Sequence, residues 1–420
     1  MEMKILLLSV GTRGDMEPFL AVAELLREKG HDVVCVFPEQ YAYLAEDAGL
    51  KFRTLGSEFI ELIEGDDGKM AMGGKGSILK KAAALWRLYG QSKSINEEMV
   101  ARQHTIVESE QPDRIVYGGK AIYPILWGIG NPDRSILLSP IPYLIHPVKD
   151  HPHIGFSRNF GTLLNTFTYS LANFGLIQTV VSTNKTVRNA LEVSRRQIKA
   201  SLFSKKMIYA ISPTIFSRPD YWPDYVQVLG YHERKNDATW DPDQELKDFI
   251  SQHDNMLFIT FGSMTNPEPE AKTKIILDIL GDHQIPAIIN TAAGGLVEPK
   301  MYNRDLIKFV SRIPYDWIFP QMFGVIHHGG SGTTHLALKH GCASLVIPHI
   351  MDQFVWKDRV HALGAGPDGT AMRTLSRSKM EPKILDLLSN QKYRIRAKEI
   401  GARMRSEDYR EQLYRFIVDI

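Results

Sequence analysis

The sequence has few of the features that mark secreted, membrane-spanning or zinc-stabilised proteins. Only two cysteines, Cys35 and Cys342, occur among 420 residues, each within an apolar stretch. Two such thiols are typical of a reducing cytosol, and no Cys/His cluster has the spacing of zinc ligands. No run approaches the roughly 18 uncharged apolar residues of a membrane span. A disulfide framework and a structural zinc site are therefore excluded.

The chain also has little net charge and no recognisable targeting segment. Its formal net charge of +2 gives no sign of a nucleic-acid partner. Met1–Val10 lacks the charged region and small-residue cleavage site of a signal peptide. Hydrophobic residues make up 44% and charged residues 23%, so a core of ordinary size can form. We expect a soluble, cytoplasmic protein with no transmembrane segment.

The sequence instead shows an α/β rhythm that occurs twice. Lys4–Val10 is an apolar run of the kind buried on both faces of a parallel sheet, and an amphipathic stretch and a second apolar run, Asp32–Phe37, follow it. The rhythm restarts at Met256–Phe261, after a Pro- and Trp-containing segment, Ser212–Asp243. We predict two Rossmann-like α/β domains, residues 1–225 and 226–391, and a helical tail, 392–420, that returns to the first domain.

Several further elements follow from local patterns of the chain. Phe160–Leu191 has helical spacing, Pro140–Pro152 is too rich in proline for a helix, and Gly65–Gly76 is expected to be a loop. Further helices are expected at 79–89, 94–109, 271–280, 331–340 and 352–363. Further strands are expected at 114–117, 135–138, 207–211, 287–290, 307–310, 324–327 and 344–348.

The strongest local motif is Val325–Thr334, VIHHGGSGTT, between an expected strand and an expected helix. The first-turn amides of such a helix are unpaired and favour an anion, and glycines let a ligand approach the backbone. The alternative is a glycine-rich turn beside a core histidine. The groups that would bind a phosphate are Gly329, Gly330, Ser331, Gly332, Thr333, Thr334 and His328.

Two other turns are expected at the same carboxyl edge of the sheet, where ligands bind in parallel α/β folds. The strand Ser344–Pro348 runs into Asp352 and Gln353, a carboxylate and a carboxamide suited to adjacent hydroxyls of a sugar. The alternative for Asp352 is capping of the next helix. Thr260–Met264 ends the first strand of the second domain and points to the same edge.

At these motifs the sequence resembles the family 1 glycosyltransferases, especially sterol 3-beta-glucosyltransferases and bacterial antibiotic or macrolide glycosyltransferases. The resemblance is detailed over about residues 3–40 and 225–370 and weak over 55–215, where that family binds its acceptor. It implies an α/β fold of two Rossmann-like domains facing across a cleft, called GT-B. The motifs that carry it are His327–Thr334, Asp352-Gln353, Phe261–Met264, Ile313–Pro320 and Gly11–Asp15 with Pro18.

The resemblance also assigns roles to residues of the donor site. His328 and the amides of Ser331–Thr334 would hold the diphosphate with help from Ser263, while Asp352 and Gln353 would hold the sugar. The uracil pocket would be lined by Val310–Ile313; the plant branch has tryptophan where Val310 stands, so base recognition here rests on other contacts. The further candidates for the donor site are Gly14 and Arg312.

The implied reaction is an inverting, metal-independent transfer of a hexose, with glucose from UDP-glucose expected first. No metal and no cofactor is expected, because a helix terminus and His328 can stabilise the leaving diphosphate. Asp15, after the first strand, is the candidate base for the acceptor hydroxyl. Its alternatives are the N-cap of a helix over Met16–Lys29 or a partner of Arg13. Plant relatives use a histidine and a later aspartate, and Tyr117–Lys120 stands where that aspartate is expected.

The acceptor is expected to be a lipophilic or aromatic hydroxyl compound, such as a natural product, phenol, sterol or lipid. The alternative function is a non-catalytic module that binds a nucleotide sugar, and an epimerase on the same fold is a third. Three loop histidines, His146, His151 and His153, are candidates for the rim of the acceptor site. The aromatic residues that would form an apolar pocket are Trp86, Tyr89, Tyr123, Trp127, Tyr143, Phe156 and Phe160.

Overall fold

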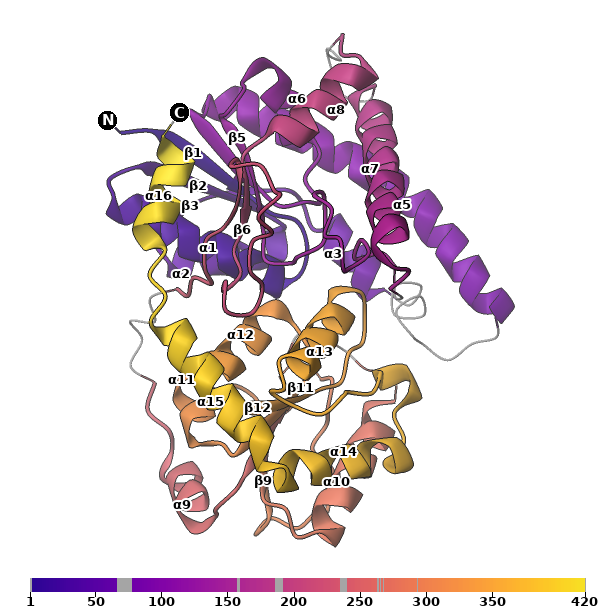
Figure 1. Ribbon diagram of the computed structural model, residues 1–420, viewed down its shortest axis with the longest axis vertical. Helices are drawn as coiled ribbons and strands as arrows, with labels where there is room; N and C mark the ends of the chain where they lie inside the picture. Colours follow the sequence, from indigo (N-terminus) through magenta and orange to yellow (C-terminus); the bar gives the residue numbers. More distant parts are fainter. Residues whose placement is uncertain are drawn as a thin grey trace. The chain divides into compact units, whose positions relative to one another are not determined.

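The computed structural model describes residues 2–65, 78–156, 159–185, 192–234, 240–262, 264, 266, 268–292 and 294–419, with the backbone alone for 64 and 78–91. These residues form two compact units (Figure 1). The first runs from the N-terminus to residue 234 and includes 408–419, and the second holds 240–407. Residues 226–234 thus lie in the first unit. Of the expected tail, residues 392–407 belong to the second unit and only the last stretch to the first.

The first unit is built on a seven-stranded, fully parallel sheet with the order β3-β2-β1-β4-β5-β6-β7. Apolar residues fill the central strands, as burial on both faces requires. The order reverses between β1 and β4, and the loops after these two strands meet at that point. The strands are β1 (Lys4–Leu8), β2 (Asp32–Phe37), β3 (Lys51–Thr54), β4 (Arg114–Tyr117), β5 (Ser135–Ser139), β6 (Met207–Tyr209) and β7 (Val226–Val228).

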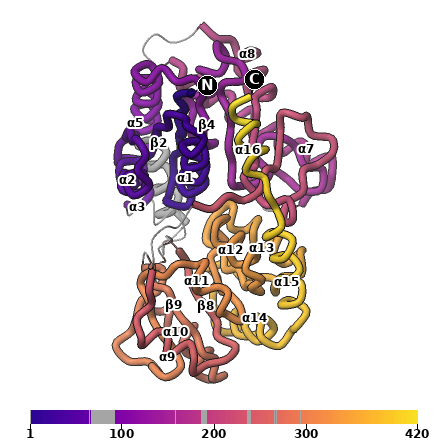
Figure 2. Tube along the Cα trace, turned by 90° about the vertical axis from the view of Figure 1, so that its left-hand side faces the viewer, coloured from indigo at the N-terminus to yellow at the C-terminus, as the bar shows by residue number. Residues whose placement is uncertain are grey.

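Helices flank this sheet, and their positions follow the strand order. Figure 2 shows α2, α3 and α5 toward the β3 end of the sheet and α7 toward the opposite end. The helices are α1 (Arg13–Glu28), α2 (Ala42–Asp47), α3 (Glu58–Glu64), α5 (Ile78–Glu110), α6 (Tyr123–Gly130), α7 (Thr162–Asn184), α8 (Arg195–Ser204) and α16 (Arg410–Val418).

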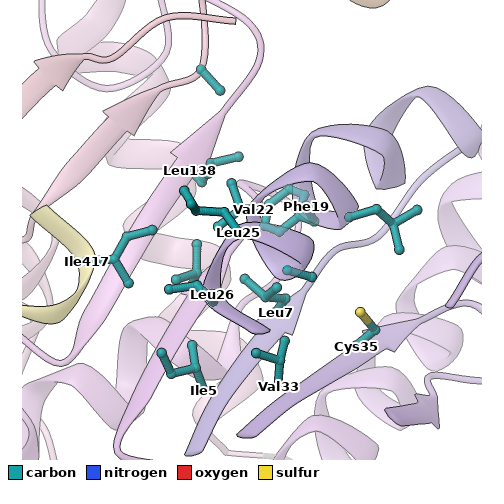
Figure 3. Packing of buried hydrophobic residues seen from close by; sticks show 14 of the residues in the cluster. Ile5, Leu7, Phe19, Val22, Leu25, Leu26, Val33, Cys35, Leu138 and Ile417 are labelled. Carbon is teal, nitrogen blue, oxygen red and sulfur yellow. The ribbon is translucent and has the colours of Figure 1, made fainter. Parts of the chain in front are cut away.

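The core of the first unit lies between α1 and the central strands. Phe19, Leu26 and Ile5 are at most 1% exposed, and Figure 3 shows them together with Ile417 of α16. The Arg114 guanidinium of β4 donates hydrogen bonds of 3.2 Å to the carbonyls of Ile417 and Val418. The C-terminal helix is therefore part of this core.

The second unit is a five-stranded parallel sheet with the order β10-β9-β8-β11-β12, which reverses between β8 and β11. Its strands are β8 (Leu257–Thr260), β9 (Ala287–Asn290), β10 (Ile307–Val310), β11 (Gly324–His327) and β12 (Ala343–Val346). Its helices are α9 (Gln244–Gln252), α10 (Pro269–Asp282), α11 (Tyr315–Ile318), α12 (Ser331–Lys339), α13 (Asp352–Ala362), α14 (Arg377–Ser389) and α15 (Gln391–Arg405).

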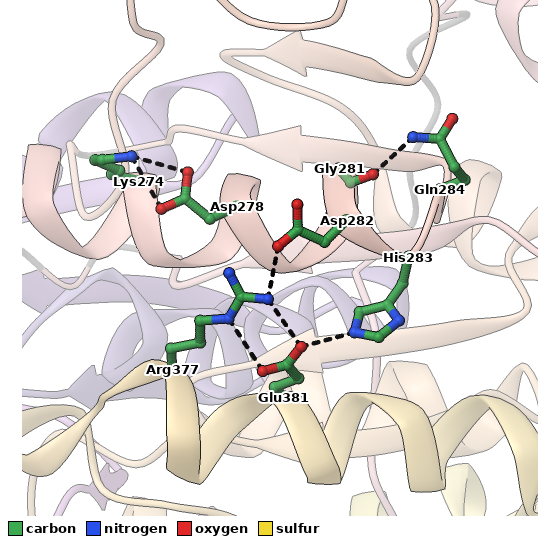
Figure 4. Close-up of polar contacts among 8 residues, drawn as sticks. All are labelled: Lys274, Asp278, Gly281, Asp282, His283, Gln284, Arg377 and Glu381. Atoms are coloured by element: carbon green, nitrogen blue, oxygen red, sulfur yellow. Dashed lines mark hydrogen bonds and ion pairs between the residues drawn. The ribbon is translucent and has the colours of Figure 1, made fainter.

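An ion-pair network joins the end of α10 to the start of α14 in this unit (Figure 4). The Arg377 guanidinium lies 2.6 Å from Asp282 and 3.0 Å from Glu381, and the His283 ring lies 2.7 Å from Glu381. Arg377, with help from His283, lowers the pKa of Glu381 to about 2. The network therefore ties α10 to α14, two helices that are in contact.

The predicted α/β fold class is confirmed. Among the strands, β2, β4, β9, β10 and β11 have the predicted bounds, whereas β3 and β7 were not predicted. The two helices expected at 79–89 and 94–109 form one helix, α5. The expected loop at 66–76 lies outside the described residues. Within the described part of the chain, no helix has both the length and the hydropathy needed to cross a membrane.

Candidate sugar-nucleotide site and candidate base

The loops after β8 and β11 meet in the second unit where the strand order reverses. Gly262 follows β8 with φ of +58°, and a Cβ placed on it would lie 2.8 Å from Cε1 of His328. The His328 ring, from the loop after β11, thus lies directly against the Gly262 backbone. Only glycine leaves room for the ring and accepts this left-handed conformation. Ser263, the predicted partner of His328, lies outside the described residues.

The N-terminus of α12 supplies amide donors beside His328. Gly330 is the N-cap of this helix, and the first helical hydrogen bond runs from the Thr334 amide to the Gly330 carbonyl at 2.9 Å. The amides of Gly332 and Thr333 precede that bond, so the helix itself offers them no acceptor. The predicted combination of a histidine and helix amides is therefore assembled in one loop. Such an arrangement favours an anion.

His328 is buried and its ring is held neutral. It is 8% exposed, and its Nδ1 has no hydrogen-bond partner among the described residues. Burial, reinforced by the neighbouring His327 and His349, moves its pKa well below the ordinary value. A neutral imidazole can donate one hydrogen bond without carrying a charge of its own. His327, which is fully buried, accepts the Gly329 amide at 3.1 Å and serves the turn.

The loop between β12 and α13 is tied to the other two loops by His349. Its Nε2 lies 2.6 Å from Oδ1 of Asn266, in the segment after β8, and its ring centre lies 6.4 Å from that of His328. Burial lowers the pKa of His349 to about 4. This link between the loops was not predicted. The ends of the apolar runs predicted the positions of the loops, but no local sequence pattern indicates that His349 contacts Asn266.

The predicted sugar clamp lies at the start of α13. Asp352 is the first residue of this helix, and Met351, with φ of +30°, is its N-cap, so Asp352 does not take the alternative role of N-cap. Gln353 is buried, and its amide oxygen accepts the His349 and Ile350 amides at 2.7 and 3.2 Å. The side-chain oxygen of Gln353 therefore holds the turn, and its NH₂ group is the part suited to a ligand.

A cavity of about 460 Å³ opens at the ends of β9 and β10. Val310 and Ser311 line it together with Thr291 and Phe309, and the Val310 carbonyl already accepts the Thr291 amide at 2.9 Å. Of the four residues predicted to line a uracil pocket, Val310 and Ser311 line this cavity. Arg312 is exposed and Ile313 is buried, and neither lines this cavity.

In the first unit, Asp15 lies where β1 and β4 diverge. It is the third residue of α1, which begins at Arg13 with Thr12 as N-cap, so the predicted helix start at Met16 is wrong. Its Oδ2 accepts the Thr12 amide at 2.8 Å and the Thr12 hydroxyl at 3.2 Å. Arg13, the other suggested partner, pairs with Glu17 instead.

Lys120 is the residue that sequence reasoning missed at this site. Its Nζ lies 3.1 Å from Oδ1 of Asp15, and the Asp15 side chain remains 23% exposed. Gly11, with φ of +143°, leaves room for this pair, because a Cβ there would overlap the Asp15 carboxylate. Gly14 is exposed in the first turn of the same helix. The pair occupies the strand-order reversal, the usual ligand position of such a sheet.

The predicted acceptor residues are only partly at a surface. Tyr123 and Tyr143 are at most 5% exposed, and the side chains of Trp86 and Tyr89 lie outside the described part of the chain. His146 is 5% exposed among aromatic rings, so it is a core residue and not the rim residue suggested by its loop. His151 stacks on Tyr143 with ring centres 3.7 Å apart, and His153 packs edge-on against Tyr169.

Two family models match separate parts of the chain. Residues 5–110 match the glycosyltransferase family 28 N-terminal domain. Residues 277–417 match the C-terminal domain of the family described as erythromycin biosynthesis protein CIII-like. The first match holds Asp15 and the second holds His328, Asp352 and Gln353.

Curated relatives extend along almost the whole chain. A sterol 3-beta-glucosyltransferase of Arabidopsis thaliana is 27% identical over 437 residues, covering 97% of this chain and 64% of the relative. A second one from the same plant is 28% identical, covering 92% and 63%. One from Debaryomyces hansenii is 26% identical, covering 96% and 26%. The chain thus spans less than two thirds of the length of these relatives.

Solved structures share the two-unit fold. The glycotransferase of kitacinnamycin aligns with a TM-score of 0.69 at 14% identity, covering 99% of this chain and 100% of that one. The calicheamicin glycosyltransferase CalG4 gives 0.69 at 14%, covering 100% and 99%. The Streptomyces sp. SF2575 glycosyltransferase SsfS6, complexed with thymidine diphosphate, gives 0.62 at 15%, covering 100% of both.

Two parallel sheets, each with its loops gathered at a strand-order reversal, and these matches define a GT-B fold. The chain is similar in sequence to sterol 3-beta-glucosyltransferases and in fold to glycosyltransferases such as CalG4, in line with the resemblance that its motifs carry.

Proposed function

We propose that the protein transfers a hexose, with glucose from UDP-glucose as the first candidate, to a hydroxyl of a lipophilic acceptor with inversion at the anomeric carbon. The acceptor hydroxyl loses its proton to Asp15 as its oxygen bonds to the anomeric carbon. The bond from that carbon to the diphosphate oxygen breaks, and its electron pair leaves with the nucleotide. The reaction needs no metal ion in this proposal.

The observation that carries the proposal is the meeting of His328, the α12 N-terminus and the Gly262 backbone in one loop cluster. Amide donors and the helix dipole stabilise the negative charge that develops on the leaving diphosphate. A neutral His328 can add one donor at the same place. Asp352 and the NH₂ group of Gln353 would then select the sugar hydroxyls.

The nucleotide would place its base in the cavity beside Val310 and Ser311. This cavity follows β9 and β10 on the same carboxyl edge of the sheet as the diphosphate cluster. A thymidine diphosphate complex is known for the similarly folded SsfS6, so the TDP sugar is the direct competitor of the UDP sugar.

Asp15 is the proposed base because it is an ordered carboxylate at the other strand-order reversal. A carboxylate has about four lone-pair sites. Thr12 donates two hydrogen bonds to Oδ2 of Asp15, and Lys120 donates one to Oδ1. The remaining lone pair of Oδ1 can accept the proton of an acceptor hydroxyl. Lys120 would hold the carboxylate in position between turnovers.

The experiment is a panel of UDP and TDP sugars against sterols, phenols and other lipophilic alcohols, read by mass spectrometry. Transfer is expected from UDP-glucose first. Asp15→Asn should lower turnover at least a hundredfold and leave calorimetric donor affinity within twofold, whereas His328→Ala should weaken that affinity about tenfold. Undiminished turnover by Asp15→Asn would refute the base, and unchanged affinity of His328→Ala would refute the diphosphate site.

The same panel separates the transferase from a non-catalytic nucleotide-sugar module. A module would bind a UDP or TDP sugar with the same dependence on His328 and transfer it to none of the acceptors. An epimerase would convert the sugar of the donor without any acceptor. The ordered Asp15–Lys120 pair favours the transferase, because binding alone has no use for a base in the first unit.

A further inference from the structure

Helix α7 has the reverse of the usual distribution of polar and apolar residues. Its buried face is largely polar and includes Asn165, Thr168 and Asn173, each at most 5% exposed. Its outer face is apolar, at the spacing of successive helical turns. We call this outer face the α7 ridge; its residues, between 45% and 87% exposed, are Phe160, Leu163, Leu164, Phe167, Leu171 and Phe174.

Hydrogen bonds to the proline-rich loop fix this orientation. Asn165 donates to the Lys149 carbonyl at 3.2 Å, and Asn173 donates to the Ile145 carbonyl at 2.9 Å. The Thr168 hydroxyl accepts the His153 amide at 2.8 Å. Rotating the helix to bury the ridge would break all three bonds and leave buried groups of the loop unpaired, which is costly. The ridge therefore faces outward because the polar face is needed inside.

Single exposed apolar residues are ordinary, whereas a contiguous patch of leucine and phenylalanine signals an interaction surface. Figure 1 shows α7 on the outside of the first unit, with α8 beside one end, and the two helices are in contact. Five of the ridge residues are more than half exposed and lie on the same side of α7. The ridge contributes little to the core of its own unit.

The charges around the ridge are of one predominant sign. Residues 159–184 contain no Asp, Glu, Lys or Arg, and residues 185–199 contain five Lys or Arg and one Glu. Lys185 ends α7, and Arg195, Arg196 and Lys199 are exposed on α8. At the other end of the ridge, the Lys149 ammonium lies 4.5 Å from the centre of the half-exposed Tyr221 ring. Asp150, Asp220 and Asp224 are the acidic residues of these loops.

We propose that the α7 ridge seats the protein on a lipid surface that contains anionic headgroups. An uncharged apolar helix face with cations beside it is the pattern of a helix lying in the membrane interface. The apolar side chains would enter the acyl boundary, while Lys185, Arg195 and Arg196 would meet the headgroups. The ridge would then give access to a lipophilic acceptor held in that surface, a step that rests on the proposed function.

Insertion can be tested on the full chain by labelling the ridge. Both native cysteines are buried, so a thiol-reactive, environment-sensitive dye should label Leu163→Cys or Phe167→Cys selectively. With vesicles of phosphatidylcholine and phosphatidylglycerol, dye at either position should shift to the blue and be quenched by brominated acyl chains. Met301→Cys, 89% exposed in the second unit, is the matched control and should show neither change. Equal quenching at Met301, or none at the ridge, would refute the proposal.

Binding strength provides an independent measurement. Phe167→Ser with Phe174→Ser should weaken vesicle binding at least tenfold, and Arg195→Gln with Arg196→Gln about fivefold per charge at low salt. Ile395→Ser, which removes a similarly exposed apolar residue, should leave binding unchanged. If the ridge variant instead dissociates a dimer in light scattering while vesicle binding persists, a second copy covers the ridge and the proposal is overturned. Vesicle binding without transfer would uphold the ridge and count against the proposed function alone.

Discussion

Replacing His146 by phenylalanine should stabilise the protein without lowering its activity. The imidazole lies among Phe203, Trp222 and Tyr225, with ring centres 6.1–6.2 Å away, and it is 5% exposed. Neither ring nitrogen has a hydrogen-bond partner among the described residues. Burial lowers the pKa of His146 to about 4. A phenyl ring fills nearly the same space and has no polar atom to desolvate.

The expected gain at pH 7 is about 1–2 kcal/mol in the free energy of unfolding, because an unpaired buried polar group costs about 1–3 kcal/mol. The gain should grow in acid. Between pH 6.5 and about 4 the unfolded chain binds a proton that the folded His146 does not. The unfolding free energy of the natural protein therefore falls by about 1.4 kcal/mol per pH unit in this window, and His146→Phe removes that loss. At pH 5 the variant should lead by about 2 kcal/mol more than at pH 7.

Calorimetric melts at pH 7 and pH 5, followed in the transition of the first unit, measure both quantities. His146→Asn, which keeps a polar group and leaves a cavity, should instead lose about 2–3 kcal/mol at pH 7. Glycosyl transfer by His146→Phe should stay within twofold of the natural protein. If His146→Phe has an unchanged or higher melting temperature but loses glycosyl transfer, His146 takes part in the reaction and is not merely a core residue.

Three further substitutions test the two sites. Gly11→Ala should lower transfer at least a hundredfold and leave calorimetric UDP-glucose affinity unchanged, because its Cβ would displace the Asp15 carboxylate; normal turnover would contradict this. Lys120→Met should lower turnover about tenfold because the Asp15 carboxylate loses the ion pair that positions it, and Lys120→Arg should restore most of the rate; undiminished turnover by Lys120→Met would contradict this positioning role. His335 is fully buried, and burial lowers its pKa to about 4, so it destabilises the second unit in acid. His335→Asn should therefore reduce the pH dependence of the unfolding free energy between pH 6.5 and 4 by about 1.4 kcal/mol per pH unit, as measured by urea titrations at several pH values. An unchanged pH dependence would contradict the assignment.

The regular elements were predictable where pattern and burial agree. The strands β9, β10 and β11 are short apolar runs between turn residues, and both faces of a parallel sheet demand such runs. In contrast, β3 is KFRT at the sheet edge and largely exposed, and β7 has three residues within a proline-rich segment. Their pairing with neighbouring strands, not their own composition, makes them strands.

The candidate site was predictable within each loop and not between loops. The motif around His328 could be recognised because several glycines follow an apolar run. The Asp15–Lys120 ion pair joins residues 105 positions apart, and no local pattern connects them. The orientation of α7 was hidden for a related reason. Its helical spacing was visible, but the burial of Asn165 and Asn173 depends on carbonyls of the Lys149 and Ile145 loop.

The two units share one feature: a glycine follows the first strand of each sheet, and a side chain lies against the backbone of that glycine. In each, the first strand of the sheet ends at the strand-order reversal and a glycine with positive φ follows, Gly11 after β1 and Gly262 after β8. The space left by the missing Cβ is taken by a side chain of a candidate site, Asp15 in one case and His328 in the other. A Cβ at either glycine would displace a charge or a donor and would not merely strain a turn. The neighbouring side chain therefore requires glycine at each of these two positions. A glycine directly after an apolar strand is visible in the sequence, so both motifs could be recognised before their partner residues were known.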